Sequence, residues 1–134
     1  MRFYTSPDAA AAKLPFSQAV QVGDVLYLSG ALGHKPGTRE VVAGGIEAET
    51  RQTMENIGTV LRANGLTFDD VFKCTVMLAD TAKWEDFNNV YLTYFTPAAC
   101  RPARLLARAD WRLARRSSLN AGHMPGRNKI VPLL

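Results

Sequence analysis

The chain has 134 residues, of which 47% are hydrophobic and 21% charged, and this length suits one domain with a single sizeable core. No run of about 18 apolar residues marks a membrane span, and a core of this size needs no disulfide staple. Lys and Arg number eight against eleven Asp and Glu up to Pro97, a net charge of −3, and eight against one from Ala98 onward, a net charge of +7. The sequence therefore predicts a domain over residues 1–97 and an atypical, arginine-rich segment over residues 98–134.

The first half of the chain predicts a hairpin followed by a helix. Residues 18–22 and 25–29 are rich in Val, Leu and Tyr and flank the turn pair Gly23-Asp24, a pattern typical of a β-hairpin. A loop containing His34 follows. Residues 46–65 then place apolar side chains at helical spacing, and the pair Asn64-Gly65 predicts the end of that helix.

The next two segments predict a strand and a second helix. Residues 71–79 alternate, with Phe72, Cys74, Val76 and Leu78 on the face that we expect under the helices. Residues 83–95 carry an aromatic stripe at helical spacing. The predicted order, β-β-(β)-α-β-α, requires one or two further strands to complete a sheet.

The two cysteines, Cys74 and Cys100, show neither a disulfide framework nor metal-ligand spacing, and His34 and His123 lie far apart in the sequence. We therefore expect a reducing, cytoplasmic setting. Cys74, on the apolar side of its strand, is expected to be a small buried hydrophobic residue rather than a nucleophile. His34 lies in a loop that could border a cleft, and nothing beyond its position suggests a role.

Five segments of the first 97 residues have a characteristic order and spacing: PFSQAV, VLYLSG, GGIEAETRQTMENIGTVL, DDVFKCTVMLAD and FNNVYLTYF. Together they cover about residues 14–97 and resemble the RidA/YjgF family of reactive-intermediate (imine and enamine) deaminases. The resemblance implies an α+β, chorismate-mutase-like fold in which a mixed sheet is backed by two helices. It also implies a homotrimer with a cleft between each pair of neighbouring subunits.

The same resemblance implies an activity. Members of the family hydrolyse 2-imino or 2-enamino acids, which pyridoxal-phosphate dehydratases release, to 2-oxo acids and ammonia. No metal or cofactor is required. We therefore expect a small imino or enamino acid as the partner molecule and no membrane association.

Three residues are candidates for the site. An arginine can hold a substrate carboxylate by two charge-assisted hydrogen bonds, each worth about 1.5 to 3 kcal/mol. The resemblance implies that Arg104, in a Pro-Ala-Arg motif, and Ser29 are catalytic and bind substrate. Phe16 occupies the place of a frequent tyrosine and is expected to wall the substrate site. The family's glutamate has no counterpart, because no acidic residue follows Asp110.

The missing glutamate suggests a change of reading frame. Residues 110–120 (DWRLARRSSLN) are compatible with codons whose neighbouring frame encodes GLALGAPVELEC, which resembles the family's last loop and strand with its glutamates. We hypothesise a one-base shift near residues 96–100. The last strand or strands would then be lost or replaced, Arg104 would be displaced by about one position, and the chain would be marginally stable, prone to associate and impaired in activity.

Other interpretations remain open. The arginine-rich segment is also typical of a solvated helix or tail with no binding role. The chain could be a non-catalytic binder of small ligands, which Phe16 and the missing glutamate favour. It could also be an RNA-associated protein that uses the basic segment as an electrostatic arm.

Overall fold

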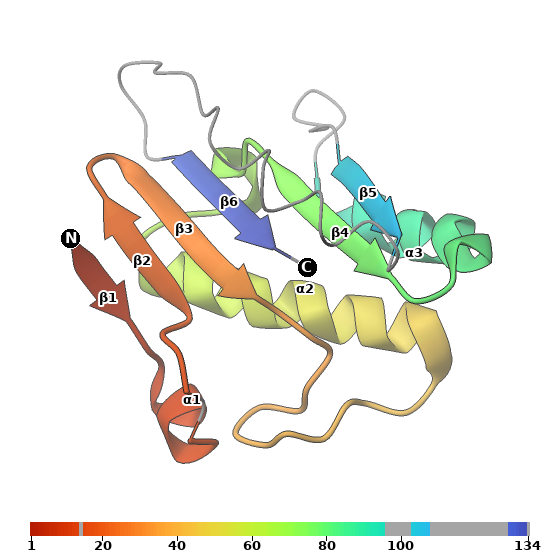
Figure 1. Cartoon of the computed structure of the whole chain (residues 1–134), viewed down its shortest axis with the longest axis horizontal. Helices are drawn as coiled ribbons and strands as arrows, with labels where there is room; N and C mark the ends of the chain where they lie inside the picture. The colour runs from red at the N-terminus through yellow and green to blue at the C-terminus, as the bar shows by residue number, and fades with distance from the viewer. Residues whose placement is uncertain (14, 96–102, 108–128, 134) are drawn as a thin grey trace.

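The computed structural model describes residues 1–13, 15–95, 103–107 and 129–133, and for the last two ranges it describes the backbone. Six strands form one mixed sheet, and the two longer helices cover one of its faces (Figure 1). The strands are β1 (Arg2–Tyr4), β2 (Ala19–Val22), β3 (Val25–Gly30), β4 (Cys74–Leu78), β5 (Ala103–Ala107) and β6 (Lys129–Leu133). The helices are α1 (Pro7–Ala11), α2 (Gly45–Ala63) and α3 (Trp84–Tyr91), with 3-10 turns at Phe68–Asp70, Thr81–Lys83 and Leu92–Tyr94.

The predicted hairpin is confirmed. Strands β2 and β3 pair antiparallel, with Val22 opposite Val25 across a two-residue loop. Gly23 has φ +57° at the first loop position, where glycine is favoured because a side chain would be strained. The sequence did not predict β1, which pairs antiparallel with β2, or α1, although Ser6 followed by Pro7 and an alanine run is a typical helix start.

Helix α2 is the element that the sequence predicted best. It runs over 19 residues and ends at Ala63, with Asn64 as its C-cap, after which Gly65 takes φ +72°. Its inner face buries Met54, Ile57 and Leu61, which are no more than 2% exposed and which pack in the same core as β3 and β4. Each such side chain contributes roughly 1.5 to 3 kcal/mol by its burial.

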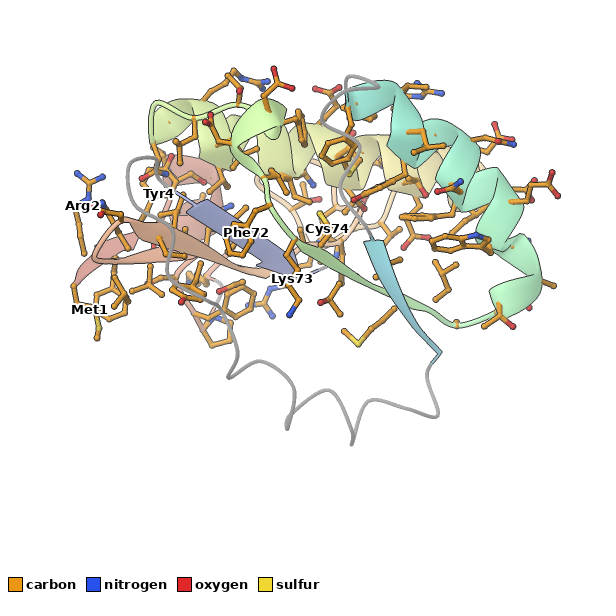
Figure 2. All side chains as sticks on the ribbon, turned by 90° about the horizontal axis from the view of Figure 1, so that it is seen from above. Met1, Arg2, Tyr4, Phe72, Lys73 and Cys74 are labelled. Atoms are coloured by element: carbon orange, nitrogen blue, oxygen red, sulfur yellow. The ribbon has the colours of Figure 1, made fainter. Side chains whose placement is uncertain are left out.

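The predicted strand over residues 71–79 is shorter than expected. Strand β4 begins at Cys74, and Cys74, Val76 and Leu78 are buried on the helix side as predicted, whereas Phe72 lies before the strand and is half-buried. Figure 2, seen from above, shows the helices on one side of the sheet, and no described helix covers the other side. Phe3, Val22 and Met77 are apolar and more than 40% exposed.

Helix α3 and the turn after it supply an aromatic wall to the core. The predicted stripe is confirmed: ring centroids lie 5.5 Å apart for Trp84 and Phe87, 5.3 Å for Phe87 and Tyr91, and 4.8 Å for Tyr91 and Phe95. Such pairs contribute about 0.5 to 1.5 kcal/mol each beyond their buried area. The helix is shorter than the predicted range of residues 83–95 because 3-10 turns flank it on both sides.

The strand order is β1-β2-β3-β6-β4-β5, so the segment after residue 97 supplies both an edge strand and a central one. Residues 129–133 lie between β3 and β4, so among the described residues the sheet has a strand at this place and the expected loss of the last strand is not seen. The solvated helix considered for the arginine-rich segment does not include Leu105 and Leu106, because these residues lie in β5, which pairs parallel with β4.

Strand β6 fits its central place imperfectly. It pairs parallel with β3, and the register shifts between Tyr27 and Gly30, opposite Pro132. Proline has no N–H to donate and is rarely found in central strands. One pair, Thr75 with Leu133, joins β6 to β4 among the described residues. Within this described part of the chain, no helix is long and apolar enough to cross a bilayer.

Candidate active site

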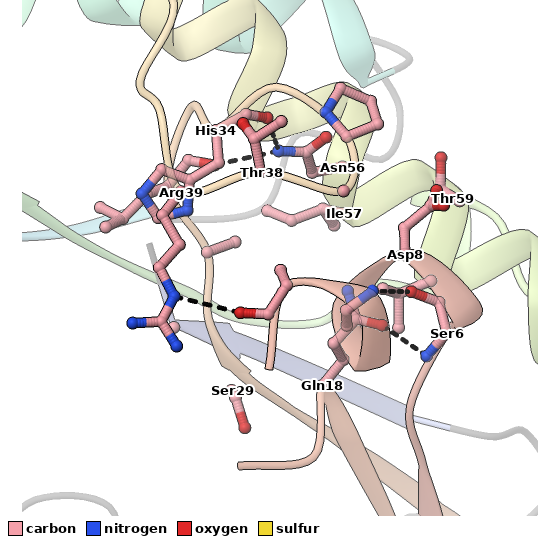
Figure 3. A pocket seen from close by; sticks show the side chains of 18 of the residues that line it. Ser6, Asp8, Gln18, Ser29, His34, Thr38, Arg39, Asn56, Ile57 and Thr59 are labelled. Carbon is pink, nitrogen blue, oxygen red and sulfur yellow. Dashed lines mark hydrogen bonds between the residues drawn. The ribbon is translucent and has the colours of Figure 1, made fainter. Parts of the chain in front are cut away.

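A cavity of about 460 Å³ opens where β3 ends. Its walls come from α1, from the segment before β2, from the loop that follows β3 and from the C-terminal half of α2 (Figure 3). Two of the predicted site residues, Phe16 and Ser29, line it. A cavity of this volume is within the usual range for small-molecule sites, about 300 to 1,000 Å³.

Gln18 ties the N-terminal segment to the strand that carries Ser29. Its side-chain oxygen accepts a hydrogen bond from the Ser6 backbone N–H at 2.9 Å, and its backbone oxygen accepts one from the N–H of Ser29, also at 2.9 Å. Ser6 in turn caps α1, because its Oγ accepts from the N–H of Ala9 at 3.1 Å. Figure 3 shows the contacts of Ser6 with Gln18 and with the first turn of α1. The wall formed by α1 is therefore fixed to the sheet.

The loop after β3 is fixed to α2. Asn56 donates from its side-chain nitrogen to the backbone oxygens of Leu32 and His34 at 3.0 and 2.9 Å. Gly33 lies so close to the helix that a Cβ at this position would come within 2.7 Å of the Glu49 backbone oxygen. The loop therefore approaches α2 more closely than any residue with a side chain would allow.

Arg39 joins the wall formed by α1 to the loop after β3. Its Nε donates to the Ala12 backbone oxygen at 3.1 Å, and its Nη2 donates to that of Lys13 at 2.7 Å. These two carbonyls lie at the C-terminal end of α1, and Arg39 itself lies in the loop after β3. The guanidinium therefore holds the mouth of the cavity together, and its positive charge lies at that mouth.

Ser29 is oriented by its own hydrogen bond. Its Oγ donates to the Ser17 backbone oxygen at 2.6 Å. Because the hydroxyl proton is used in this way, the lone pairs of the Ser29 oxygen are the part of this group that can still accept a hydrogen bond. Phe16 is 47% exposed and forms an apolar wall at the same place.

Arg104 is not brought to this cavity within one chain. Its backbone lies in β5 opposite Thr75, and β6 and β4 separate β5 from β3. Three strand spacings correspond to roughly 14 Å. The Arg104 side chain lies outside the described part of the structure, so its predicted role stays a prediction.

The predicted character of Cys74 is confirmed. The residue is 1% exposed, and burial raises the pKa of its thiol from 9.0 to about 11, against the smaller lowering effect of a hydrogen bond with Tyr91. A thiol with this pKa stays neutral near pH 7 and is a poor nucleophile. His34, by contrast, does border the cavity, as its loop position suggested.

Sequence reasoning missed Gln18, Asn56 and Arg39 as residues that build the site. Gln18 belongs to a segment that carried the resemblance, but its partner Ser6 lies 12 residues earlier, in a part where no helix was predicted. Asn56 and Arg39 act through contacts 22 to 27 residues away along the chain. No local pattern encodes such contacts.

The fold and the cavity define a class of protein: an α+β domain with a mixed sheet, two helices on one face, and a cavity of small-molecule size at the end of the second hairpin strand. Residues 6–114 match the family model described as Endoribonuclease L-PSP. The chain belongs to this family, which is the RidA/YjgF family.

Known relatives agree with this assignment. Over 87 residues the chain is 44% identical to a mouse protein named 2-iminobutanoate/2-iminopropanoate deaminase, and the match covers 65% of this chain and 64% of the mouse protein. The structure of the Escherichia coli YjgF gene product is 32% identical with a TM-score of 0.70, covering 81% of this chain and 87% of that one. RidA from Psychrobacter is 34% identical with a TM-score of 0.68, covering 80% and 84%.

Proposed function

We propose that this chain is a hydrolase of reactive 2-imino and 2-enamino acids. In the reaction, water adds to the imine carbon and ammonia leaves, so a 2-imino acid and water give a 2-oxo acid and ammonia. The observation that carries the proposal is the cavity in which Ser29 and Phe16 lie together. The identity of 44% to a protein named as such a deaminase supports it.

The residues of the cavity suit the steps of this reaction. Ser29 Oγ accepts a hydrogen bond from the imine nitrogen, which orients the imine carbon toward water. Phe16 covers one side of the substrate and excludes solvent there. Binding in a fixed geometry lowers the entropic part of the activation barrier. For a reaction that is already easy in water, this is the main contribution that the protein has to make.

We propose that the substrate carboxylate is bound by Arg104 of a neighbouring subunit in a homotrimer. Two observations support this: within one chain Arg104 lies about 14 Å from β3, and the sheet face without helices exposes Phe3, Val22 and Met77. Covering those side chains with a second copy would stabilise the assembly by the hydrophobic effect. Light scattering should then give a mass of about 44 kDa, three times the 14.7 kDa of one chain.

Activity can be tested with 2-iminopropanoate made in place by an amino-acid oxidase acting on alanine. Semicarbazide traps the imine, so an active chain lowers the yield of trapped product and speeds the release of ammonia and pyruvate. We expect Ser29→Ala to lower kcat/KM at least tenfold, about the effect of losing one hydrogen bond to the reacting group. Thr81→Ala, an exposed hydroxyl outside the cavity, is the matched control. If the purified trimer does not accelerate imine hydrolysis, the chain is not a deaminase.

We also propose that residues after about 96–100 are translated one base out of frame. The charge change at Pro97, the absence of an acid after Asp110 and the position of Pro132 in a central strand support this. The nucleotide sequence across codons 94–124 decides it: if no neighbouring frame encodes a strand like VELE, the proposal is wrong. A gene corrected by one base should encode a more stable and more active protein.

A second candidate function is association with RNA in the cytoplasm. The eight basic residues against one acidic residue after Ala98 favour it, since such a cluster attracts phosphates. The affinity for a single-stranded RNA should then fall steeply with salt and vanish when residues 98–134 are deleted.

A third candidate function is the binding of small ligands without catalysis. It predicts saturable binding of 2-oxo acids by a chain that leaves the imine unchanged.

A further inference from the structure

The cavity that Ser29 lines also has buried apolar residues in its wall. Leu28, Ile57 and Val60 are these residues, and each of them is at most 7% exposed. Ala9 and Ala12 of the α1 segment also line the cavity. The small side chains of these two alanines leave space that larger residues would fill.

The charged residues of the cavity lie at its mouth. Asp8, Lys35 and Arg39 line the cavity and are exposed, whereas its apolar residues on β3 and α2 are buried. Lys35 is paired with Glu40 at 3.2 Å, and Arg39 holds the end of α1. The cavity therefore has a polar entrance and an apolar end, the distribution expected for a ligand with one charged and one apolar end.

The volume exceeds what the smallest substrate of the proposed reaction needs. The side chain of 2-iminopropanoate is one methyl group, whereas a cavity of about 460 Å³ is large enough for a much bulkier acid. The walls do not close down easily, because Gln18, Asn56 and Arg39 fix them by hydrogen bonds at both ends. A methyl group would leave most of the apolar surface in contact with water.

We propose that this cavity binds the side chain of the substrate and selects 2-imino acids with large apolar side chains, such as those derived from leucine and phenylalanine. This inference rests on the proposed deaminase function. Ser29 binds the imine end near the mouth, and the apolar side chain reaches between Ile57 and Ala12. Each buried methylene raises affinity several-fold, so a leucine-derived side chain gains at least about tenfold over a methyl group.

The test measures turnover and binding separately on the full chain. Turnover of the leucine-derived and alanine-derived imines gives the ratio of the two kcat/KM values, expected to be at least about ten. Calorimetric binding of the stable products, 4-methyl-2-oxopentanoate and pyruvate, gives the same preference without any chemistry. The cavity variant is Ala12→Phe, which places a ring in the apolar space, and the control is Ala11→Phe, on an exposed neighbour that does not line the cavity.

Ala12→Phe should lower the leucine-to-alanine ratio at least fivefold, about the worth of one or two buried methylenes, and Ala11→Phe should leave the ratio as it is. Circular dichroism shows whether each variant folds. If a variant does not fold, the ratio of the two kcat/KM values measured on the unmodified chain still tests the proposal. Hydrolysis of both imines with a ratio near one overturns the size preference while the deaminase function stands. Absence of any hydrolysis, with either imine, rejects the deaminase function itself.

Discussion

Replacing Gly33 by alanine tests whether the close approach of the loop to α2 maintains the site. The new Cβ would meet the Glu49 backbone oxygen and Cγ at 2.7 Å, closer than real Cβ contacts allow. Because one of these atoms belongs to the backbone of α2, the loop has to move away. Overpacking of this kind costs about 1 to 3 kcal/mol. The two hydrogen bonds from Asn56 to Leu32 and His34 would weaken as well, at roughly 1 kcal/mol each.

The expected loss is about 2 to 4 kcal/mol, a large part of a total stability of about 5 to 15 kcal/mol. For a chain of this size it corresponds to a fall in Tm of roughly 10 °C. Urea and thermal unfolding followed by circular dichroism measure it. Gly37→Ala is the control: φ is +70° there, but nothing lies within 4 Å, so about 1 kcal/mol of backbone strain is expected.

A Gly33→Ala protein that unfolds like the unmodified chain, or that is more stable than Gly37→Ala, would refute the reasoning. The binding of 2-oxo acids adds a second measurement. Movement of the loop displaces Leu32, His34 and Arg39 together, so Gly33→Ala should weaken binding, whereas Gly65→Ala, at a glycine of φ +72° that does not line the cavity, should not. Equal affinities for both variants would show that the loop does not shape the cavity.

Four further predictions concern the thiol of Cys74, the loop after β3 and the stability of the whole chain. In a Cys100→Ser background, Cys74 should react with a thiol reagent at pH 8 only as fast as the chain unfolds, because it is 1% exposed, and fast labelling would contradict its burial. Since burial raises the pKa of Cys74 from 9.0 to about 11, the folded state favours the neutral thiol. The raised pKa of Cys74 contributes about 3 kcal/mol to the free energy of unfolding; this contribution is complete below pH 9 and is lost as the pH rises toward 11. A Cys74→Ser chain should lack this loss in urea titrations. Asn56→Ala should speed hydrogen exchange and proteolysis in the loop after β3, and Asn89→Ala, on an exposed face of α3, should not. If the segment after residue 97 is out of frame, the chain should lack a single cooperative transition well above about 60 °C, and a sharp one there would count against the frame shift.

Local patterns predicted the elements whose side chains follow a clear period. Helix α2 has apolar residues at helical spacing and a Gly65 that stops it, and the β2–β3 hairpin has Gly23 at a turn position that favours glycine. The aromatic stripe of α3 was found for the same reason. Helix α1 was missed because it has five residues and an alanine run with no apolar period, although Ser6 and Pro7 mark its start.

The predicted site residues do not all lie at one place in the chain's fold. Ser29 and Phe16 came from the resemblance, and the structure places both in one cavity. Arg104 came from the same resemblance, and its strand β5 is an edge strand that β6 and β4 separate from β3. The residues that hold the walls, such as Asn56 and Arg39, had no signal in the sequence.

The sequence by itself determined where the chain turns and which faces are apolar, because these depend on neighbouring residues and on the periods of helix and strand. It also determined the abrupt change of charge at Pro97. The tertiary structure alone decided that residues 129–133 lie between β3 and β4, and that a glycine in one loop and an asparagine in α2 set the depth of a cavity beside Ser29. Such contacts join residues far apart in the chain, and their energy depends on where the backbone places them rather than on any local pattern.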